Sequence, residues 1–205
     1  MKYDVKNRGT NTKEHWETSH TQMYIPNWKS YQTDEAIQNI IQSNWWHYEW
    51  VMNNILTTEM SRKNIVDIGC APNGCLVSYA LKYPDLKFSG IDFTDAILEY
   101  AKDFVHIPNL AFHKIDFLEQ DIPGEYGAIL MMETLEHVED GVNFALVDDL
   151  LKQCEYFYIS VPADDSSNGG EHISHYTLDS FNSYDVLQKQ ADGRGLLYFK
   201  LRGKL

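Results

Sequence analysis

The fold of this chain is decided by the stretch Asn64-Ile65-Val66-Asp67-Ile68-Gly69-Cys70-Ala71-Pro72-Asn73-Gly74. Its first half is an apolar run typical of a buried strand, and Asp67 places a carboxylate near the end of that strand. The loop behind it contains two glycines, and a helical pattern begins at Cys75. A strand, a glycine-containing turn and a helix bring backbone N–H groups around one point. The stretch therefore predicts a ligand-binding corner in an α/β sheet.

Segments with strand and helix patterns alternate along the rest of the chain. This alternation predicts a doubly wound α/β fold with a mostly parallel, Rossmann-like sheet and helices on both faces. Thr94 is a candidate N-cap for the helix that follows it. We expect helices over 75–82, 94–104, 141–153 and 178–190, and strands over 86–92, 110–116, 126–132, 156–161 and 196–201.

The N-terminal region differs in composition. Residues 1–21 are polar, with few aliphatic side chains, and predict a loose arm. From Thr33 to Leu56, apolar residues recur at three- and four-residue spacing, which predicts one amphipathic helix or two helices. Aromatic residues crowd this region and either fill the core beneath a docked helix or form a lid over a substrate pocket. They are Trp28, Tyr31, Trp45, Trp46, Tyr48 and Trp50.

Composition excludes several classes of protein. The chain has 205 residues and a net charge of −13, which argues against general nucleic-acid binding because phosphate contacts need clustered Lys and Arg. Three cysteines give no disulfide framework or paired zinc motif, which favours a reducing compartment, and we expect a cytoplasmic protein. No apolar stretch is long enough for a membrane-spanning helix, and the polar N-terminus does not match a signal peptide.

Two phosphate-binding motifs fail to match at the glycine corner. A dinucleotide site would carry G-x-G-x-x-G, but this loop has only Gly69 and Gly74. These two glycines have the spacing of a P-loop, yet Cys75 and Leu76 stand where a P-loop needs Lys and Ser or Thr. The carboxylate of Asp67 would also repel phosphate. The corner suits a ligand with a cationic or neutral end.

Two further carboxylates follow the next predicted strands. Asp92 ends the second strand, where a carboxylate accepts hydrogen bonds from a ribose diol. Asp116 ends the third strand and can accept from the exocyclic amine of adenine, with Phe117 flanking the ring. Together with Asp67, these residues predict a nucleoside site without phosphate.

This set of motifs resembles the class I S-adenosylmethionine-dependent methyltransferases over roughly residues 64–177. The matching segments are Val66–Cys70, the ribose motif Gly90-Ile91-Asp92, the adenine-side pair Asp116-Phe117, the fourth strand with its "LEHV" turn (126–138), and Ser160-Val161-Pro162. The resemblance implies S-adenosylmethionine as cofactor. The implied binding residues are Asp67, Gly69, Cys70, Ala71, Gly74, Asp92, Phe93, Asp116, Phe117 and Met132.

One loop departs from the family pattern. Ala71-Pro72-Asn73-Gly74 replaces the more usual Gly-Thr-Gly and is one residue longer. The same Ala-Pro-x-Gly form resembles the loop of some RNA 2′-O-methyltransferases. The catalytic lysines of those enzymes have no obvious counterparts in this sequence.

Acids and histidines follow the fourth and fifth strands. Glu133, Glu136 and His137, with His172 further on, resemble the metal-using sites of ubiquinone-pathway O-methyltransferases and small-RNA 3′-terminal 2′-O-methyltransferases. The resemblance implies a divalent ion, Mg²⁺, that polarises a substrate hydroxyl. Alternatively, His137, His172 or Glu133 acts as a metal-free base or substrate contact, or the cluster only caps a helix and packs.

The sequence thus favours O-methylation of a small molecule or glycan, with N-methylation left open. The alternatives are a metal-using RNA 2′-O-methyltransferase and a non-catalytic S-adenosylmethionine-binding protein. We expect residues 1–60 to form an arm and an aromatic helical lid, and residues 61–205 to form the methyltransferase domain. The acceptor and the oligomeric state do not follow from the sequence.

Overall fold

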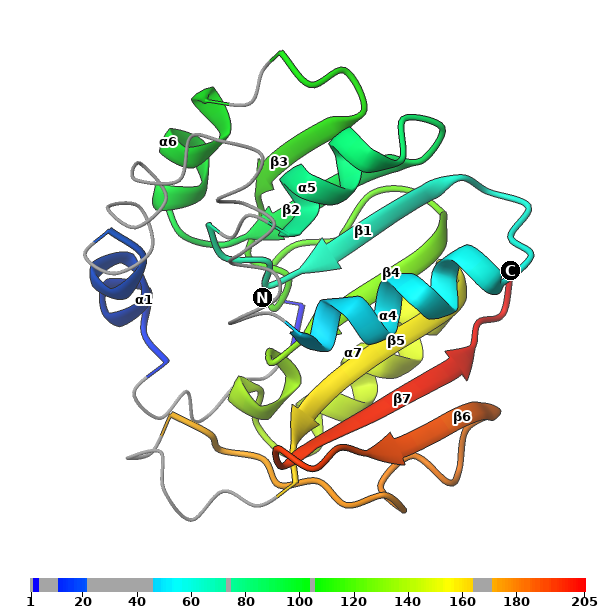
Figure 1. The fold of residues 1–205 in the computed structure, drawn as a ribbon. Helices are drawn as coiled ribbons and strands as arrows, with labels where there is room; N and C mark the ends of the chain where they lie inside the picture. The colour runs from blue at the N-terminus through cyan, green and yellow to red at the C-terminus, as the bar shows by residue number, and fades with distance from the viewer. Residues whose placement is uncertain (1, 4–10, 22–45, 73–74, 104–105, 164–170) are drawn as a thin grey trace.

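A seven-stranded sheet forms the centre of the protein (Figure 1). The structure is a computed structural model that describes residues 2–3, 11–21, 46–72, 75–103, 106–163 and 171–205. The strand order is β3-β2-β1-β4-β5-β7-β6. Strands β1 to β5 run parallel, whereas β7 is antiparallel to both β5 and β6. The strands are β1 (Asn64–Ile68), β2 (Lys87–Asp92), β3 (Leu110–Lys114), β4 (Tyr126–Met132), β5 (Cys154–Pro162), β6 (Val186–Ala191) and β7 (Leu196–Arg202).

Helices cover both faces of this sheet, as the alternating pattern predicts. Helices α4 (Trp46–Thr57), α5 (Cys75–Lys82) and α6 (Ala96–Lys102) share one apolar cluster with side chains such as Ile65 and Leu130. Helix α7 (Val142–Leu151) packs on the opposite face against neighbouring strand residues such as Val66. Because successive side chains of a strand point to opposite faces, one strand supplies both layers. Every residue of β4 is buried, which places this strand at the centre.

The predicted helix over 178–190 is wrong. Residues 178–183 form turns, and β6 pairs with β7 as an antiparallel hairpin. Exposed and half-buried side chains alternate along β6, which is the pattern of an edge strand. The sequence carried a hairpin signal in Asp192-Gly193, because Asp-Gly is a favoured turn pair.

The N-terminal region also differs from the loose arm predicted for residues 1–21. Helix α1 (Lys13–Ser19) begins at Thr12, whose hydroxyl accepts a hydrogen bond from the N–H of His15 at 3.2 Å. Of the predicted amphipathic helix from Thr33, the structure confirms α4, while residues 22–45 lie outside the described part, including Trp28, Tyr31 and Trp45.

The predicted N-cap role of Thr94 is wrong as well. Asp95 holds the cap position of α6, and the Thr94 hydroxyl instead donates to Asp92. Elsewhere the bounds of α5 and β4 are those predicted. Within the described residues, no helix combines the length and the apolar character needed to cross a membrane.

Candidate active site

The corner after β1 depends on a glycine. Gly69 has φ +74°, and a Cβ there would lie 2.4 Å from the Thr134 side chain, so only glycine fits without displacement. The N–H groups of Gly69 and Cys70 both donate to the carbonyl of Ile91, at 2.8 and 3.1 Å. These bonds fix the turn against the end of β2. Gly74, predicted to bind cofactor, lies outside the described residues.

The next two predicted cofactor residues are placed differently. Cys70 is buried, and burial raises the pKa of its thiol well above the ordinary value, so it packs as a small apolar residue. Ala71 has a positive φ of 46°, which is strained for a residue with a Cβ. The N–H of Ala71 donates to Oδ2 of Asp92 at 3.2 Å. The loop is thus tied to the second strand's carboxylate.

Asp67 is fully buried beneath this corner. Its Oδ2 accepts a hydrogen bond of 2.5 Å from the hydroxyl of Tyr48 on α4. Its Oδ1 is buried too, and no described group donates to it. Burial raises the pKa of Asp67 to about 7, against the lowering effect of the Tyr48 bond, and the charge of Asp92 raises it further. A buried carboxylate oxygen without a donor is costly and marks a place where a donor can bind.

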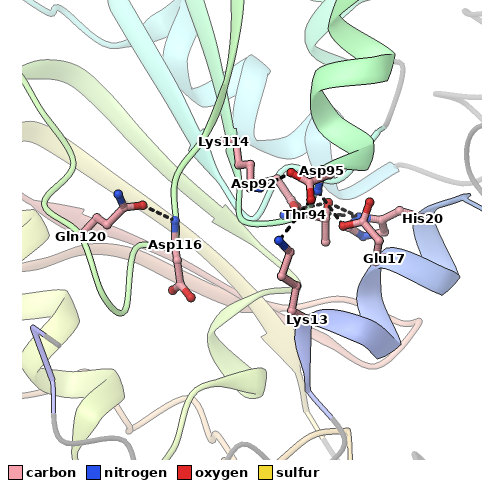
Figure 2. Close-up of polar contacts among 9 residues, drawn as sticks. All are labelled: Lys13, Glu17, His20, Asp92, Thr94, Asp95, Lys114, Asp116 and Gln120. Atoms are coloured by element: carbon pink, nitrogen blue, oxygen red, sulfur yellow. Dashed lines mark hydrogen bonds and ion pairs between the residues drawn. The ribbon is translucent and has the colours of Figure 1, made fainter.

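Asp92 ends β2 and is held by polar neighbours (Figure 2). Its Oδ1 accepts from the N–H and the hydroxyl of Thr94, at 2.9 and 2.7 Å. His20, at the end of α1, lies with Nδ1 2.9 Å from the Thr94 hydroxyl and 3.8 Å from Asp92 Oδ1. Burial lowers the pKa of His20, which favours the neutral ring. Since the Thr94 hydroxyl donates to Asp92, it accepts from His20, which assigns the proton to Nδ1.

Helix α1 is anchored beside Asp92 by the start of α6 (Figure 2). Lys13 Nζ lies 3.2 Å from Oδ2 of Asp95, and the N–H of Asp95 donates to Glu17 at 2.6 Å. Lys114, at the end of β3, pairs with the same Asp95 carboxylate. These contacts hold α1 across the carboxyl ends of β2 and β3.

Asp116 lies in the loop after β3, on the same edge of the sheet. Its Oδ1 accepts from the N–H of Leu118 at 3.0 Å, and its own N–H donates to Gln120 at 3.1 Å (Figure 2). Phe117 is buried, and Phe93, after Asp92, is half-buried. The three predicted carboxylates therefore stand at or just past the ends of three neighbouring strands.

Met132 ends β4 and is buried, and Glu133 follows it in an unusual conformation. Glu133 has φ +52°, a region that residues with a side chain rarely occupy. The hydroxyl of Ser160 donates to its Oε1 at 2.8 Å, and the Glu133 N–H donates to the Ser160 carbonyl at 3.0 Å. Burial raises the pKa of Glu133 to about 7, and the charge of Asp192 adds to this. Strained residues with shifted pKa values gather at functional sites.

Three of the four residues predicted to hold a metal come together. Glu136, His137 and His172 offer ligand atoms that lie within 4.8 Å of one another. The rings of the two histidines are edge to face, with centroids 4.8 Å apart. Glu133 is not a member of this group, because its carboxylate accepts from Ser160.

Helix α1 also reaches this histidine cluster, which the sequence analysis missed. The ring of Trp16 lies edge to face on His137, with centroids 5.0 Å apart. His15 Nε2 lies 3.2 Å from the Glu171 carboxylate, and Asn11 donates to the Glu171 carbonyl at 2.5 Å. The α1 segment therefore contacts both parts of the site, through His20 beside Asp92 and through Trp16 on His137. Thr12, followed by acidic Glu14, was the capping signal for it.

Comparisons with known proteins agree with this geometry. No family model matches the chain. An N-methyltransferase, NodS, from Bradyrhizobium japonicum WM9, solved with S-adenosyl-L-homocysteine, superposes with a TM-score of 0.59 at 15% identity, over 89% of this chain and 98% of its own. An rRNA methylase from Escherichia coli gives a TM-score of 0.63 at 14% identity, over 96% of this chain and 78% of its own. The chain has the class I methyltransferase fold.

Two curated relatives match part of this chain by sequence. An uncharacterised protein of Rickettsia prowazekii (strain Madrid E) is 27% identical over 128 residues, which is 60% of this chain and 21% of the relative. A malonyl-[acyl-carrier protein] O-methyltransferase of Acetivibrio thermocellus is 30% identical over 81 residues, which is 39% of this chain and 28% of the relative. The matched segments thus span less than a third of either relative's length.

Proposed function

We propose that this protein is an S-adenosylmethionine-dependent methyltransferase that methylates an oxygen of a small-molecule acceptor. The observation that carries the proposal is the buried Asp67 carboxylate at the glycine corner, whose Oδ1 has no donor among the described residues. A cationic ammonium group, such as that of the methionine end of the cofactor, satisfies this atom. A methyltransferase fold supports the same assignment.

The other carboxylates fit the rest of the cofactor. Asp92 is fixed by Thr94 and Ala71 and keeps lone pairs to accept from a ribose diol. Asp116, with one oxygen bound by Leu118, can accept from the adenine amine beside Phe117. These roles remain those that the sequence resemblance implies, and the placement of the side chains at one sheet edge supports them.

Glu133 is our candidate for the general base. When bound, S-adenosylmethionine supplies an electrophilic methyl group, whose bond to sulfur breaks as the acceptor oxygen attacks, and the electron pair leaves with sulfur. Glu133 takes the proton of the acceptor hydroxyl, because a carboxyl with a pKa of about 7 is partly ionised at neutral pH. The Ser160 hydroxyl fixes the carboxylate in place. His137 and His172 are candidates to orient the acceptor.

A metal-assisted version of the reaction is a second candidate, supported by the grouping of Glu136, His137 and His172. Two imidazoles and one carboxylate suit transition metals such as Mn²⁺, Fe²⁺ or Zn²⁺ better than the Mg²⁺ implied by the resemblance, since Mg²⁺ prefers oxygen ligands. Chelator treatment followed by re-addition of each ion separates these cases. Loss of methyl transfer with chelator and its recovery with an ion supports a metal-assisted reaction. Unchanged activity with chelator refutes it.

The proposed function is tested by methyl transfer from labelled S-adenosylmethionine to panels of phenols, sugars, amines and short RNA. We expect incorporation into a hydroxyl-bearing small molecule, and we expect Glu133→Gln to lower it by about 10²-fold or more without changing cofactor affinity. Incorporation into RNA alone would refute the small-molecule acceptor. Failure of every acceptor together with failure to bind the cofactor would refute the proposal as a whole.

A further inference from the structure

An open groove lies between α4 and the β6–β7 hairpin, with a volume of about 630 Å³. This volume is in the ordinary range for ligand sites. The first half of α4 and the hairpin turn lie at the edge of the sheet where β4 and β5 end (Figure 1). The lining side chains that define its chemistry are Glu49, Trp50 and Asn53 from α4, and Gln190, Asp192 and Arg194 from the hairpin.

One wall of the groove is a fixed aromatic surface. Trp50 packs on Tyr198, with ring centroids 5.0 Å apart, and edge to face on Tyr158 at 6.2 Å. Tyr198 is itself buried, and its hydroxyl donates to Asp192 at 3.0 Å. Trp50 is only partly buried, so part of its indole remains accessible. Because the indole of Trp50 is already fixed, it loses little conformational entropy when an apolar face of a ligand packs on it.

The remaining lining is polar and balanced between donors and acceptors. Glu49 contributes carboxylate acceptors, whereas Asn53 and Gln190 each offer both an amide donor and an acceptor. Asp192 is fixed by the N–H groups of Arg194 and Leu196, at 2.8 and 2.9 Å. The carboxylates of Glu49 and Asp192 outnumber the one guanidinium of the lining, that of Arg194, so the net negative charge disfavours phosphate. A wholly apolar ligand would leave these polar groups without partners, which is costly.

Sugars match this combination of surfaces. The C–H face of a pyranose packs on an indole, its hydroxyls donate to carboxylates, and they accept from amides. The volume accommodates one or two sugar units, and the open side leaves room for a longer substrate.

Both walls of the groove are linked to the candidate active site. Tyr48, the neighbour of Glu49 on α4, donates to the cofactor residue Asp67. On the other side, Tyr198 of the groove pairs with Ser160 on β5, and the Ser160 hydroxyl donates to Glu133 at 2.8 Å. The groove is therefore one strand position away from the serine that fixes the candidate base.

We propose that this groove is the acceptor subsite and that it binds a neutral or cationic saccharide whose hydroxyl extends toward Glu133. The inference rests on the proposed function for the transfer of methyl, but the binding of sugar is independent of it. Glu49, Asn53 and Gln190 then select the acceptor, and Trp50 supplies the stacking face.

Saturation-transfer NMR with the full chain tests the binding directly. Glucose, N-acetylglucosamine, rhamnose, glucosamine and cellobiose serve as probes, with phenol and glucose 6-phosphate for comparison. We expect saturation of sugar ring protons in the intact protein and a loss of affinity of about tenfold or more in the double variant Asn53→Ala/Gln190→Ala. Asn53 is exposed and Gln190 is half-buried on the edge strand β6, so the fold should persist.

Leu56→Ala is the matched control, because Leu56 lies on α4, is 45% exposed and does not line the groove. It should bind sugars as the unchanged protein does. Trp50→Ala is a second test, with the cofactor-induced rise in Tm checking that it folds. Stronger saturation of phenol than of any sugar, or equal sugar binding in the double variant, overturns the inference. Cofactor binding without sugar binding overturns the groove assignment alone, and sugar binding without cofactor binding overturns only the proposed function.

Discussion

Replacing Asp67 by Asn should stabilise the cofactor-free protein at alkaline pH and at the same time remove its affinity for S-adenosylmethionine. Burial raises the pKa of Asp67 from 3.8 to about 7. Each pKa unit corresponds to about 1.4 kcal/mol, so the ionised carboxylate costs the folded state roughly 4 kcal/mol above pH 7. Asn is neutral, and its amide oxygen can still accept from the Tyr48 hydroxyl, so the variant avoids this cost.

The sign of the pH dependence follows from proton linkage. The folded pKa of Asp67 lies above its unfolded value, so the folded state binds more protons between pH 3.8 and about 7. The stability that this group contributes is present below the unfolded pKa and is lost as pH rises through about 7. The free energy of unfolding of Asp67→Asn should therefore exceed that of the wild type by an amount that grows by roughly 2 to 3 kcal/mol from about pH 5 to about pH 8.

Urea unfolding at several pH values measures this difference. Asp85→Asn, which removes an exposed carboxylate in the turn after α5, is the matched control for the loss of one charge. Calorimetric titration with S-adenosylmethionine completes the test. A gap that does not change with pH, or a variant that keeps its cofactor affinity, would refute the assignment of Asp67 as a buried cofactor carboxylate.

Three further predictions test other parts of the site. His20→Ala removes the ring that donates to Thr94 and should weaken cofactor binding about tenfold by calorimetry, and unchanged affinity would separate α1 from the cofactor site. The rate of methyl transfer should rise with pH through about 7 as Glu133 ionises, whereas Glu133→Gln should leave only a low rate without that rise; a wild-type profile flat in this range would argue against Glu133 as base. Gly69→Ala should lower the free energy of unfolding by about 1 to 3 kcal/mol, because of its positive φ and the contact with Thr134, whereas Gly193→Ala, with open space around it, should not; equal stability of the two variants would contradict the close packing of the turn.

The sequence predicts the fold where local signals and burial agree. The bounds of β4 and α5 follow from continuous apolar runs that end at turn residues. The segment 178–190 was misread because β6 is an edge strand that depends on pairing with β7, and the only local signal for that pairing is the turn at Asp192-Gly193. Helix α1 was missed for a related reason. Its polar sequence buries little apolar surface, and contacts with Asp95 and Glu171 hold it in place.

In the candidate site, too, the sequence predicts some residues and not others. The positions of Asp67, Asp92 and Asp116 after successive strands could be predicted because parallel strands end at one edge. The partners Tyr48 and His20 could not, since each lies far away along the chain. Glu133 was grouped with the histidines by its spacing, but its left-handed backbone turns it toward Ser160.

Titration calorimetry of the intact chain with S-adenosylhomocysteine tests the assignment of the glycine corner most directly. Asp92→Ala is the companion variant, because Asp92 holds both Thr94 and the Ala71 loop. We expect saturable one-to-one binding with a dissociation constant in the micromolar range, corresponding to about −8 kcal/mol, and a loss of at least tenfold in the variant. Absence of binding to the intact protein, or equal binding by the variant, would contradict the cofactor site described for this fold.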